Sequence, residues 1–208
     1  MTSTLPSPPD ARSALLGAAT RLIRERGYAA TSVNDLCREA GVSKGAFFHH
    51  FASKDELAVE AAKNWSAVTG ALFREADYHL HERAADRVFA YLDLREDLLA
   101  GAVSEFTCLA GTLVQEAHGE DAIRAACAES ILGHAATLES DIAQALADAG
   151  VPHSVTAQSL ARHTQAVLQG AFILAKAEGD AAPVREGIGH LRQYLTTLFT
   201  PSAERSAP

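Results

Sequence analysis

The 208-residue sequence predicts an all-α protein with a small N-terminal head and a larger helical body. Apolar residues recur at three- and four-residue spacing along most of the chain, and helix N-caps and glycine stops punctuate them. No alternating strand pattern interrupts this succession. We expect residues 1–9 to be a flexible leader, 10–55 the head, 56–200 the body and 201–208 a flexible tail.

The elements of the head follow from the apolar pattern and the caps. Apolar residues over 15–23 predict a first helix that stops at Gly27. Ser32 with Asp35 three positions on resembles a capping box for a second helix, which ends at Gly41. These signals place a short helix directly after the first one.

Two further caps complete the head and open the body. Ser43 can cap a third helix at once, and Ser53 with Glu56 forms a capping box that begins a fourth. The apolar pattern and its Gly, Pro or charged interruptions then predict helices near 54–79, 84–100, 104–117, 120–149, 154–178 and 184–199.

The net charge of -8 is spread unevenly along the chain. Residues 11–54 carry seven basic and three acidic side chains, whereas residues 55–208 carry 11 basic and 22 acidic ones. A basic head on an acidic body indicates a polyanionic partner for the head alone. No uncharged stretch approaches the roughly 20 residues that span a bilayer, so we expect a soluble cytoplasmic protein with no membrane partner.

The turn over residues 40–43 joins two short helices in the layout of a helix-turn-helix, whose second helix enters the major groove of DNA. It is flanked by further motifs, namely Thr31-Ser32-Val33, Asp35-Leu36, Ala40-Gly41-Val42-Ser43-Lys44-Gly45, Phe47-Phe48-His49-His50-Phe51 and Ser53-Lys54-Asp55-Glu56-Leu57. This run resembles the DNA-binding signature of the TetR family of bacterial transcriptional regulators. The resemblance implies a homodimeric repressor that binds a palindromic operator and is released by a small-molecule effector, with no enzymatic activity, cofactor or metal.

The predicted recognition helix spans residues 44–51, and Gly45 allows its backbone to approach DNA closely. The resemblance and this geometry assign DNA contacts to Thr31, Ser32, Ser43, Lys44, Gly45, Phe48, His49, His50 and Lys54. Phe48 stands where the family usually has Tyr, so a hydroxyl contact to phosphate is missing. Phe47 and Phe51 are expected in the core of the head. His49 and His50 point about 100° apart on a helix and cannot chelate one metal ion without further ligands.

The last two helices of the body carry the predicted dimer interface. The final helix has apolar residues at alternating four- and three-residue steps, and its predecessor is apolar almost all round. One face can meet the chain's own core and the other a second subunit, although a single monomeric core is the alternative. The predicted interface residues are Val167, Ala171, Phe172, Ile188, Leu191, Leu195 and Leu198.

The effector site is assigned to aromatic, thiol and imidazole side chains of the body, namely Trp65, Tyr91, Phe106, Cys108, His118, His134 and Phe172. Each of them is also compatible with plain packing. Residues 106–116 resemble a Cys-Leu-x-Gly-x-x-x-Gln-Glu stretch in one branch of the family, some members of which sense electrophiles or oxidants. A thiol-based repressor using Cys108 is therefore the alternative function, although Glu105 and Glu116 are the only charged neighbours in sequence.

Two further hypotheses about the function differ from a ligand-responsive regulator. Cys108 with His118 or His134 could serve as nucleophile and base of a helical enzyme, but no catalytic motif supplies the rest of such a site. A DNA-binding protein without an effector is the other reading, and an enclosed cavity in the body would argue against it. The three cysteines form no C-x-x-C pair, which argues against a disulfide framework and a zinc finger.

Overall fold

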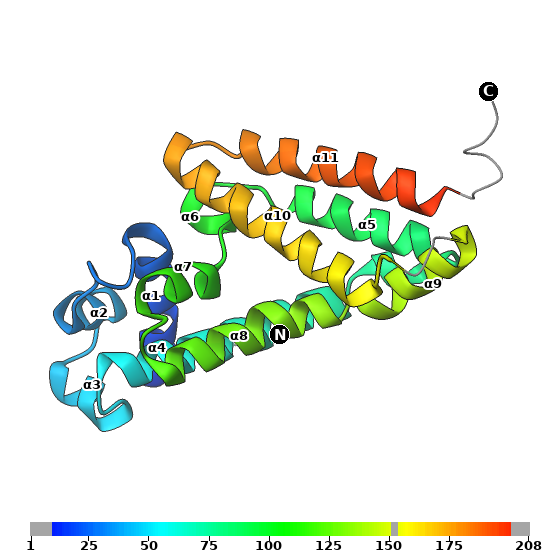
Figure 1. Cartoon of the computed structure of the whole chain (residues 1–208). Helices are drawn as coiled ribbons and strands as arrows, with labels where there is room; N and C mark the ends of the chain where they lie inside the picture. The colour runs from blue at the N-terminus through cyan, green and yellow to red at the C-terminus, as the bar shows by residue number, and fades with distance from the viewer. Residues whose placement is uncertain (1–9, 151–153, 201–208) are drawn as a thin grey trace, which may run out of the picture.

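The computed structural model describes residues 10–150 and 154–200, and every regular element within them is helical, as predicted (Figure 1). The predicted leader 1–9 and tail 201–208 lie outside the described residues. The elements are α1 (Ala11–Arg26), α2 (Val33–Ala40), α3 (Lys44–His50), α4 (Lys54–Arg74), the 3-10 helix η1 (Asp77–Leu80), α5 (Ala84–Asp97), α6 (Val103–Phe106), α7 (Leu109–Ala117), α8 (Asp121–Ala136), α9 (Glu139–Ala149), α10 (Ala157–Glu178) and α11 (Ala182–Phe199). None of the described helices is long and apolar enough to cross a membrane.

The predicted caps of the head are present. Ser32 and Asp35 form the capping box of α2, and Gly41 ends that helix in the left-handed conformation with a φ of 66°. The hydroxyls of Ser43 and Ser53 each accept a hydrogen bond from the backbone N–H three residues on, at the start of α3 and α4. Because these caps act over three residues, the local sequence determines them.

Three helices predicted as continuous are divided in the structure. The helix predicted over 54–79 stops at Arg74, and the helix over 104–117 breaks at Thr107, whose backbone is extended. The helix over 120–149 breaks at Thr137 and Leu138, where the Thr137 hydroxyl donates to the carbonyl of His134. Leu138 is buried there, so the apolar pattern continues through the break and conceals it in the sequence.

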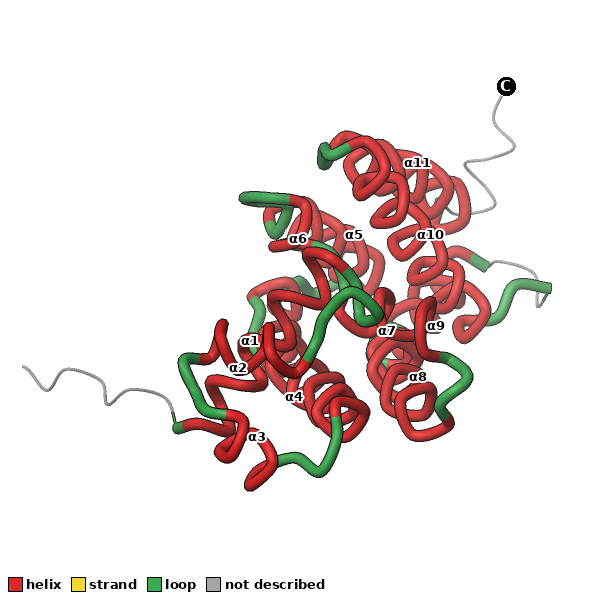
Figure 2. Tube along the Cα trace, turned by 90° about the vertical axis from the view of Figure 1, so that its left-hand side faces the viewer, coloured by secondary structure: helices red, strands yellow, loops and turns green. Residues whose placement is uncertain are grey.

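The helices form two layers with the head at one end (Figures 1 and 2). The long helices α4 and α8 pack side by side, and α5, α10 and α11 form the layer on the other side of the body. The helices α1, α2 and α3 gather around the start of α4. Because α4 runs from the head into the body, it links the two parts directly.

The described residues contain two apolar cores. One lies in the body between α5, α9, α10 and α11. The other joins Phe47 and Phe51 of the head to Leu57 of α4 and to Leu109 and Leu113 of α7. This second core crosses the predicted boundary at residues 55 and 56, so the head packs continuously onto the body, and the boundary itself stays a prediction.

Candidate DNA-binding face and effector cavity

The outward face of α3 carries the exposed side of the head. Four predicted contact residues are exposed there, namely Lys44, Gly45, Phe48 and His49, while His50 is half-buried. Phe48 is 57% exposed, although Phe47 beside it is fully buried. The expectation that Phe47 and Phe51 belong to the core is therefore confirmed. An exposed ring next to an exposed lysine on a short capped helix is suited to contact with a polyanion.

Three other predicted contacts have partners within the head. Thr31 is only 1% exposed, and its hydroxyl donates to the carbonyl of Gly27 at 2.7 Å, so its assignment as a DNA contact was wrong. The ammonium group of Lys54 donates to the carbonyl of Tyr28 at 3.1 Å and lies 3.9 Å from the centroid of the Tyr28 ring. Ser32 is exposed, but its hydroxyl is engaged with Asp35 in the capping box.

The acid of that capping box is held ionised. Hydrogen bonds from Ser32, followed by the one from Arg38, lower the pKa of Asp35 to about 2. The negative charge therefore stays at the N-terminus of α2 at any physiological pH, where it complements the helix dipole.

Arg24 of α1 connects the head to the body. Its Nε donates to the carbonyl of Thr107 at 2.7 Å, and its guanidinium carbon lies 4.7 Å from the centroid of the Trp65 ring. Burial lowers the pKa of Arg24. Neither Nη2 of Arg24 nor Oγ1 of Thr107 has a hydrogen-bond partner, although both atoms are buried. Such unpaired buried atoms are costly, so the hydrogen bonding of this junction is incomplete.

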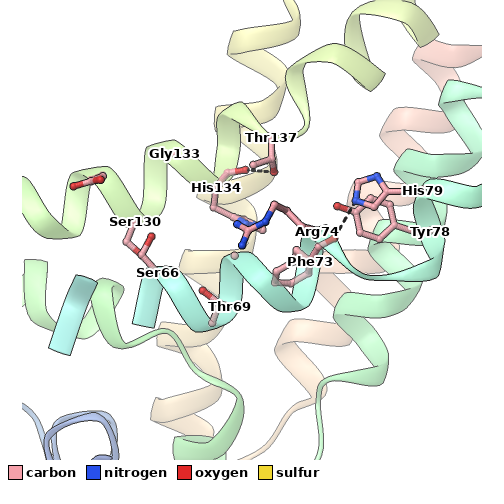
Figure 3. Close-up of a pocket in the computed structure, with 12 residues that line it drawn as sticks. Ser66, Thr69, Phe73, Arg74, Tyr78, His79, Ser130, Gly133, His134 and Thr137 are labelled. Atoms are coloured by element: carbon pink, nitrogen blue, oxygen red, sulfur yellow. Dashed lines mark hydrogen bonds between the residues drawn. The ribbon is translucent and has the colours of Figure 1, made fainter. Parts of the chain in front are cut away.

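A cavity of about 260 Å³ lies between α4, η1 and α8 (Figure 3). In the close-up, Ser66, Thr69 and Phe73 come from α4, and Ser130 and His134 come from the facing helix α8. A narrower chamber of about 50 Å³ continues toward α10 and shares Thr69, Phe73, Ser130 and His134 with the cavity. We call the two together the effector cavity.

Most of the residues predicted for the effector site meet at this narrower chamber. Its lining includes Trp65, Phe106, Cys108, His134 and Phe172. Tyr91 is fully buried and lies behind His134, with 3.0 Å between its hydroxyl and Nε2 of the imidazole. His118 does not join this group. It is exposed beyond the C-terminal end of α7, whereas Cys108 precedes the N-terminal end of the same helix.

The sequence analysis missed the polar group that surrounds Tyr91. Arg95 donates through Nε to the Tyr91 hydroxyl at 2.8 Å, and Gln165 donates through Nε2 at 3.2 Å. Both Arg95 and Gln165 line the narrower chamber. The four-residue spacing of Tyr91 and Arg95 on one helix was the available signal. Gln165 lies 74 positions from Tyr91 and gave none.

These hydrogen bonds fix the protonation of His134. A tyrosine hydroxyl has one proton to donate, and the two acceptor sites of Tyr91 are taken by Arg95 and Gln165. The Tyr91 hydroxyl therefore donates to Nε2 of His134, which places the imidazole proton on Nδ1. Burial and then the nearby charge of Arg95 lower the pKa of His134 to about 3, which agrees with a neutral ring.

The predicted dimer residues are largely used within the chain. Ala171, Phe172, Ile188, Leu191 and Leu195 are buried in the body core of a single chain, because α11 turns its apolar seam onto α10, α5 and α9. Val167 and Leu198 are partly buried against the same core. The assignment of these five buried residues to a partner subunit therefore needs correction, whereas that of Val167 and Leu198 stays a prediction. The exposed apolar side chains on these two helices are Ile173, Leu174 and Tyr194.

The three cysteines occupy different environments. Cys37 and Cys127 are buried, and burial raises the pKa of both thiols, that of Cys127 to about 11. Cys108 is half-buried at the N-cap of α7, where its sulfur accepts a hydrogen bond from the N–H of Gly111 at 3.4 Å. The fold also brings the positive charges of Arg24 and Lys176 to interact with Cys108, which its sequence neighbours did not suggest.

Comparisons with known proteins agree with this arrangement. Residues 15–61 match the sequence family described as bacterial regulatory proteins of the tetR family, and residues 84–188 match the C-terminal domain described as transcriptional regulator LmrA/YxaF-like. The HTH-type transcriptional regulator LmrA of Bacillus subtilis is 26% identical over 187 residues, which cover 84% of this chain and 91% of LmrA.

Another relative and a solved structure extend over nearly the whole chain. An uncharacterized HTH-type transcriptional regulator of Mycobacterium tuberculosis is 29% identical over 199 residues, 94% of this chain and 97% of its own length. The crystal structure of a regulatory protein TetR from Rhodobacter sphaeroides superposes with a TM-score of 0.79 at 22% identity, covering 88% of this chain and 98% of that protein.

A transcriptional repressor of M. tuberculosis is more similar over a shorter stretch, 41% identical over 76 residues that cover 36% of this chain and 40% of the repressor. The relatives are DNA-binding transcriptional regulators, and this chain is likewise a helix-turn-helix regulator and not an enzyme. The two sequence matches, one on the head and one on the body, show that the chain belongs to the TetR family of bacterial regulatory proteins.

Proposed function

We propose that this regulator is a cytoplasmic homodimeric repressor that binds a palindromic operator through α3 and leaves it when a small molecule fills the effector cavity. One observation carries the proposal. The apolar core of the head continues into α7 and into α4 and α8, and these last two helices wall the cavity at their other ends. The M. tuberculosis relative named as a repressor supports the direction of regulation.

The face of α3 supplies few side chains that can read bases. Lys44 and His49 are exposed and can reach base edges, whereas Phe48 offers only an apolar ring. Specificity therefore depends in part on groove shape and deformability, which the protein senses through phosphate contacts. Two such heads about 34 Å apart match successive major grooves of a palindrome.

Dimerisation is proposed through the exposed side of α10 and α11. Leu174 is 55% exposed and Tyr194 is 42% exposed, and both lie on the two helices that the core binds only on one side. We expect Leu174→Glu to convert a dimer into a monomer in size-exclusion chromatography with light scattering, and to abolish operator binding. Leu80→Glu is the matched control, because Leu80 is also exposed but lies on η1. A dimer that survives Leu174→Glu would place the interface elsewhere.

Two contacts can transmit effector binding to the head. The helix α4 begins beside Leu57 in the core of the head and reaches the cavity at Thr69 and Phe73. Trp65 lines the narrower chamber on one side and meets Arg24 of α1 on the other. A ligand that displaces Trp65 therefore shifts α1 and changes the distance between the two recognition helices. A coupling of about 1–3 kcal/mol corresponds to a 5- to 150-fold loss of operator affinity.

The test is fluorescence anisotropy of the purified protein on duplexes that tile the DNA upstream of its own gene, repeated at several salt concentrations. We expect tight binding to one palindromic segment that weakens steeply with salt. Addition of a ligand that fills the cavity then lowers the affinity. Weak and uniform binding to every duplex would contradict the presence of an operator in this DNA. An operator affinity that no cavity ligand changes would contradict the release mechanism.

A thiol-sensing repressor is the second candidate, and the surroundings of Cys108 favour it. The sulfur lies at a helix N-terminus, interacts with the charges of Arg24 and Lys176, and borders the narrower chamber. Alkylation of this half-buried sulfur by an electrophile would add bulk next to the Arg24 contact with the carbonyl of Thr107.

The thiol candidate is tested with N-ethylmaleimide. Treatment is expected to release operator DNA from the wild type and from Cys127→Ser, whose thiol is buried, but not from Cys108→Ser. Release of operator DNA that persists in Cys108→Ser would exclude the thiol-sensing candidate and leave a non-covalent effector as the proposal.

A further inference from the structure

We infer that the ligand of the effector cavity is an organic anion, a carboxylate on a body of one or two aromatic rings, with Arg95 as the residue that binds its charge. This inference rests on the proposed effector response and names the chemical class of the effector. It is carried by the hydrogen-bonding groups, the charges and the shape of the cavity.

Arg95 is a cation without a counter-ion. Among residues 10–150 and 154–200 it forms no ion pair, and its hydrogen bond through Nε to Tyr91 leaves both Nη groups without an acceptor. Its guanidinium carbon lies 4.7 Å from the ring centroid of Phe73, which holds the plane of the group in place. A planar guanidinium with free Nη donors matches the two oxygens of a carboxylate.

The neighbouring His134 supplies a donor as well. The Tyr91 hydroxyl is fully used, and the neutral imidazole of His134 keeps a proton on Nδ1 that makes no hydrogen bond among the described residues. His134 lines both parts of the effector cavity. Arg95 and His134 thus offer unpaired donors to a ligand that brings acceptors, and a negative charge among those acceptors satisfies Arg95, while the amide groups of Gln165 and Gln169 in the lining can donate or accept.

The walls of the narrower chamber are aromatic. Trp65 and Phe73 of α4 line it together with Phe106 and Phe172, whose ring centroids are 6.4 Å apart. Such walls favour a flat unsaturated body through offset or edge-to-face contacts. The volumes of about 260 and 50 Å³ lie near the lower end of the range of about 300–1,000 Å³ found for small-molecule sites, which limits the ligand to one or two rings.

The rim of the wider part is consistent with this choice. Arg74 lines it in Figure 3 and forms no ion pair among the described residues. Glu129, in the middle of α8, is the one carboxylate in the lining, and its side chain is exposed. With Arg95 inside and Arg74 outside against this single acid, the cavity as a whole carries a positive balance that draws an anion inward.

The test compares three probes of nearly equal shape, cinnamate, its neutral isostere cinnamamide and the cation cinnamylamine. Binding is measured by isothermal titration calorimetry and by the fluorescence of Trp65, which is the only tryptophan of the chain and lines the narrower chamber. We expect cinnamate to bind about tenfold or more tightly than cinnamamide, and cinnamylamine to bind least.

Variants then test the role of Arg95. Arg95→Gln is expected to weaken the binding of cinnamate about tenfold or more while leaving the affinity for cinnamamide within about twofold of the wild type. The retained binding of cinnamamide also shows that the variant is folded with its cavity intact. Arg83→Gln is the matched control, because Arg83 is exposed at the start of the same helix and lines neither part of the effector cavity. It should bind all three probes like the wild type.

The outcomes separate this inference from the proposed function. Equal or tighter binding of the amide or the amine, no binding of cinnamate, or unchanged cinnamate affinity in Arg95→Gln would overturn the anion inference and leave an effector of another class. Cinnamate that binds through Arg95 without changing operator affinity in the anisotropy assay would support the inference and count against release by the effector.

Discussion

The hydroxyl groups of the head and the donor groups of the effector cavity differ in whether they have a hydrogen-bond partner within the protein. In the head, the hydroxyls of Ser43 and Ser53 cap helices, and the Thr31 hydroxyl meets the carbonyl of Gly27. In the cavity, both Nη groups of Arg95 and Nδ1 of His134 have no partner among the described residues. A folding unit that satisfies its own donors is rigid, whereas a region that leaves donors unpaired gains free energy when a ligand supplies acceptors.

The largest expected effect separates the core of the head from its DNA-binding face. Phe47→Ala removes a fully buried ring and should destabilise the protein by about 3–5 kcal/mol. Phe48→Ala removes a ring that is 57% exposed, so its stability should stay within about 0.5 kcal/mol of the wild type while operator binding weakens. Urea unfolding and operator anisotropy measure the two effects.

The two adjacent phenylalanines serve as controls for each other. Equal destabilisation by both substitutions would show that the ring of Phe48 packs in solution and is not presented to DNA. Unchanged operator affinity of a folded Phe48→Ala protein would remove Phe48 from the binding face.

A second prediction concerns the loss of stability at low pH that His134 in the cavity should cause. The folded state lowers the pKa of His134 from 6.5 to about 3, so the unfolded chain takes up a proton first as the pH falls. Acidification therefore favours unfolding, and between about pH 7 and pH 5 this residue alone costs about 2 kcal/mol of stability. The groups facing it are Arg95, which opposes protonation, and Tyr91.

The measurement is the free energy of unfolding in urea at both pH values for the wild type and for His134→Gln. Because glutamine does not titrate, the wild type should lose about 2 kcal/mol more than the variant on acidification. The comparison cancels the carboxylates that titrate in both proteins. An equal loss in both would mean that His134 is accessible to a proton in the folded state.

These two regions also differ in how much of them could be predicted from the sequence. The caps at Ser32, Ser43 and Ser53 act over three residues, and the resemblance of this short run to known regulators placed the recognition helix correctly. Thr31 was assigned wrongly because the family signature gives no information about which hydroxyl turns inward. The pairing of Lys54 with Tyr28 was missed because it spans 26 positions.

The cavity depends on contacts across much longer separations. Trp65, Phe106 and Phe172 were selected by residue type alone, and the fold does bring them together. Arg95 was missed because an arginine on an amphipathic helix is ordinarily a solvated charge. The seam of α11 was correctly read as apolar, but periodicity cannot distinguish a partner subunit from the chain's own α5 and α9.

A third prediction concerns the junction between the two regions. Arg24→Gln removes the cation that lies against Trp65 and should leave operator affinity close to that of the wild type while reducing the effector response by about 1 kcal/mol, roughly fivefold. Arg21→Gln is the control, since Arg21 lies on the same helix but is exposed and paired with Glu39. Anisotropy with and without a cavity ligand distinguishes them, and an unchanged response in Arg24→Gln would assign the coupling to α4 alone.

The smallest expected effect tests which of two lysines belongs to the DNA-binding face. Lys44 is exposed and forms no ion pair among the described residues, so Lys44→Ala should reduce the slope of log affinity against log salt by about 0.9. Lys54 is held by the carbonyl and the ring of Tyr28, so Lys54→Ala should lower stability by about 1 kcal/mol and leave the slope unchanged. A reduced slope in Lys54→Ala would mean that operator DNA draws this ammonium away from Tyr28, because a phosphate then competes successfully with a partner that the head already provides.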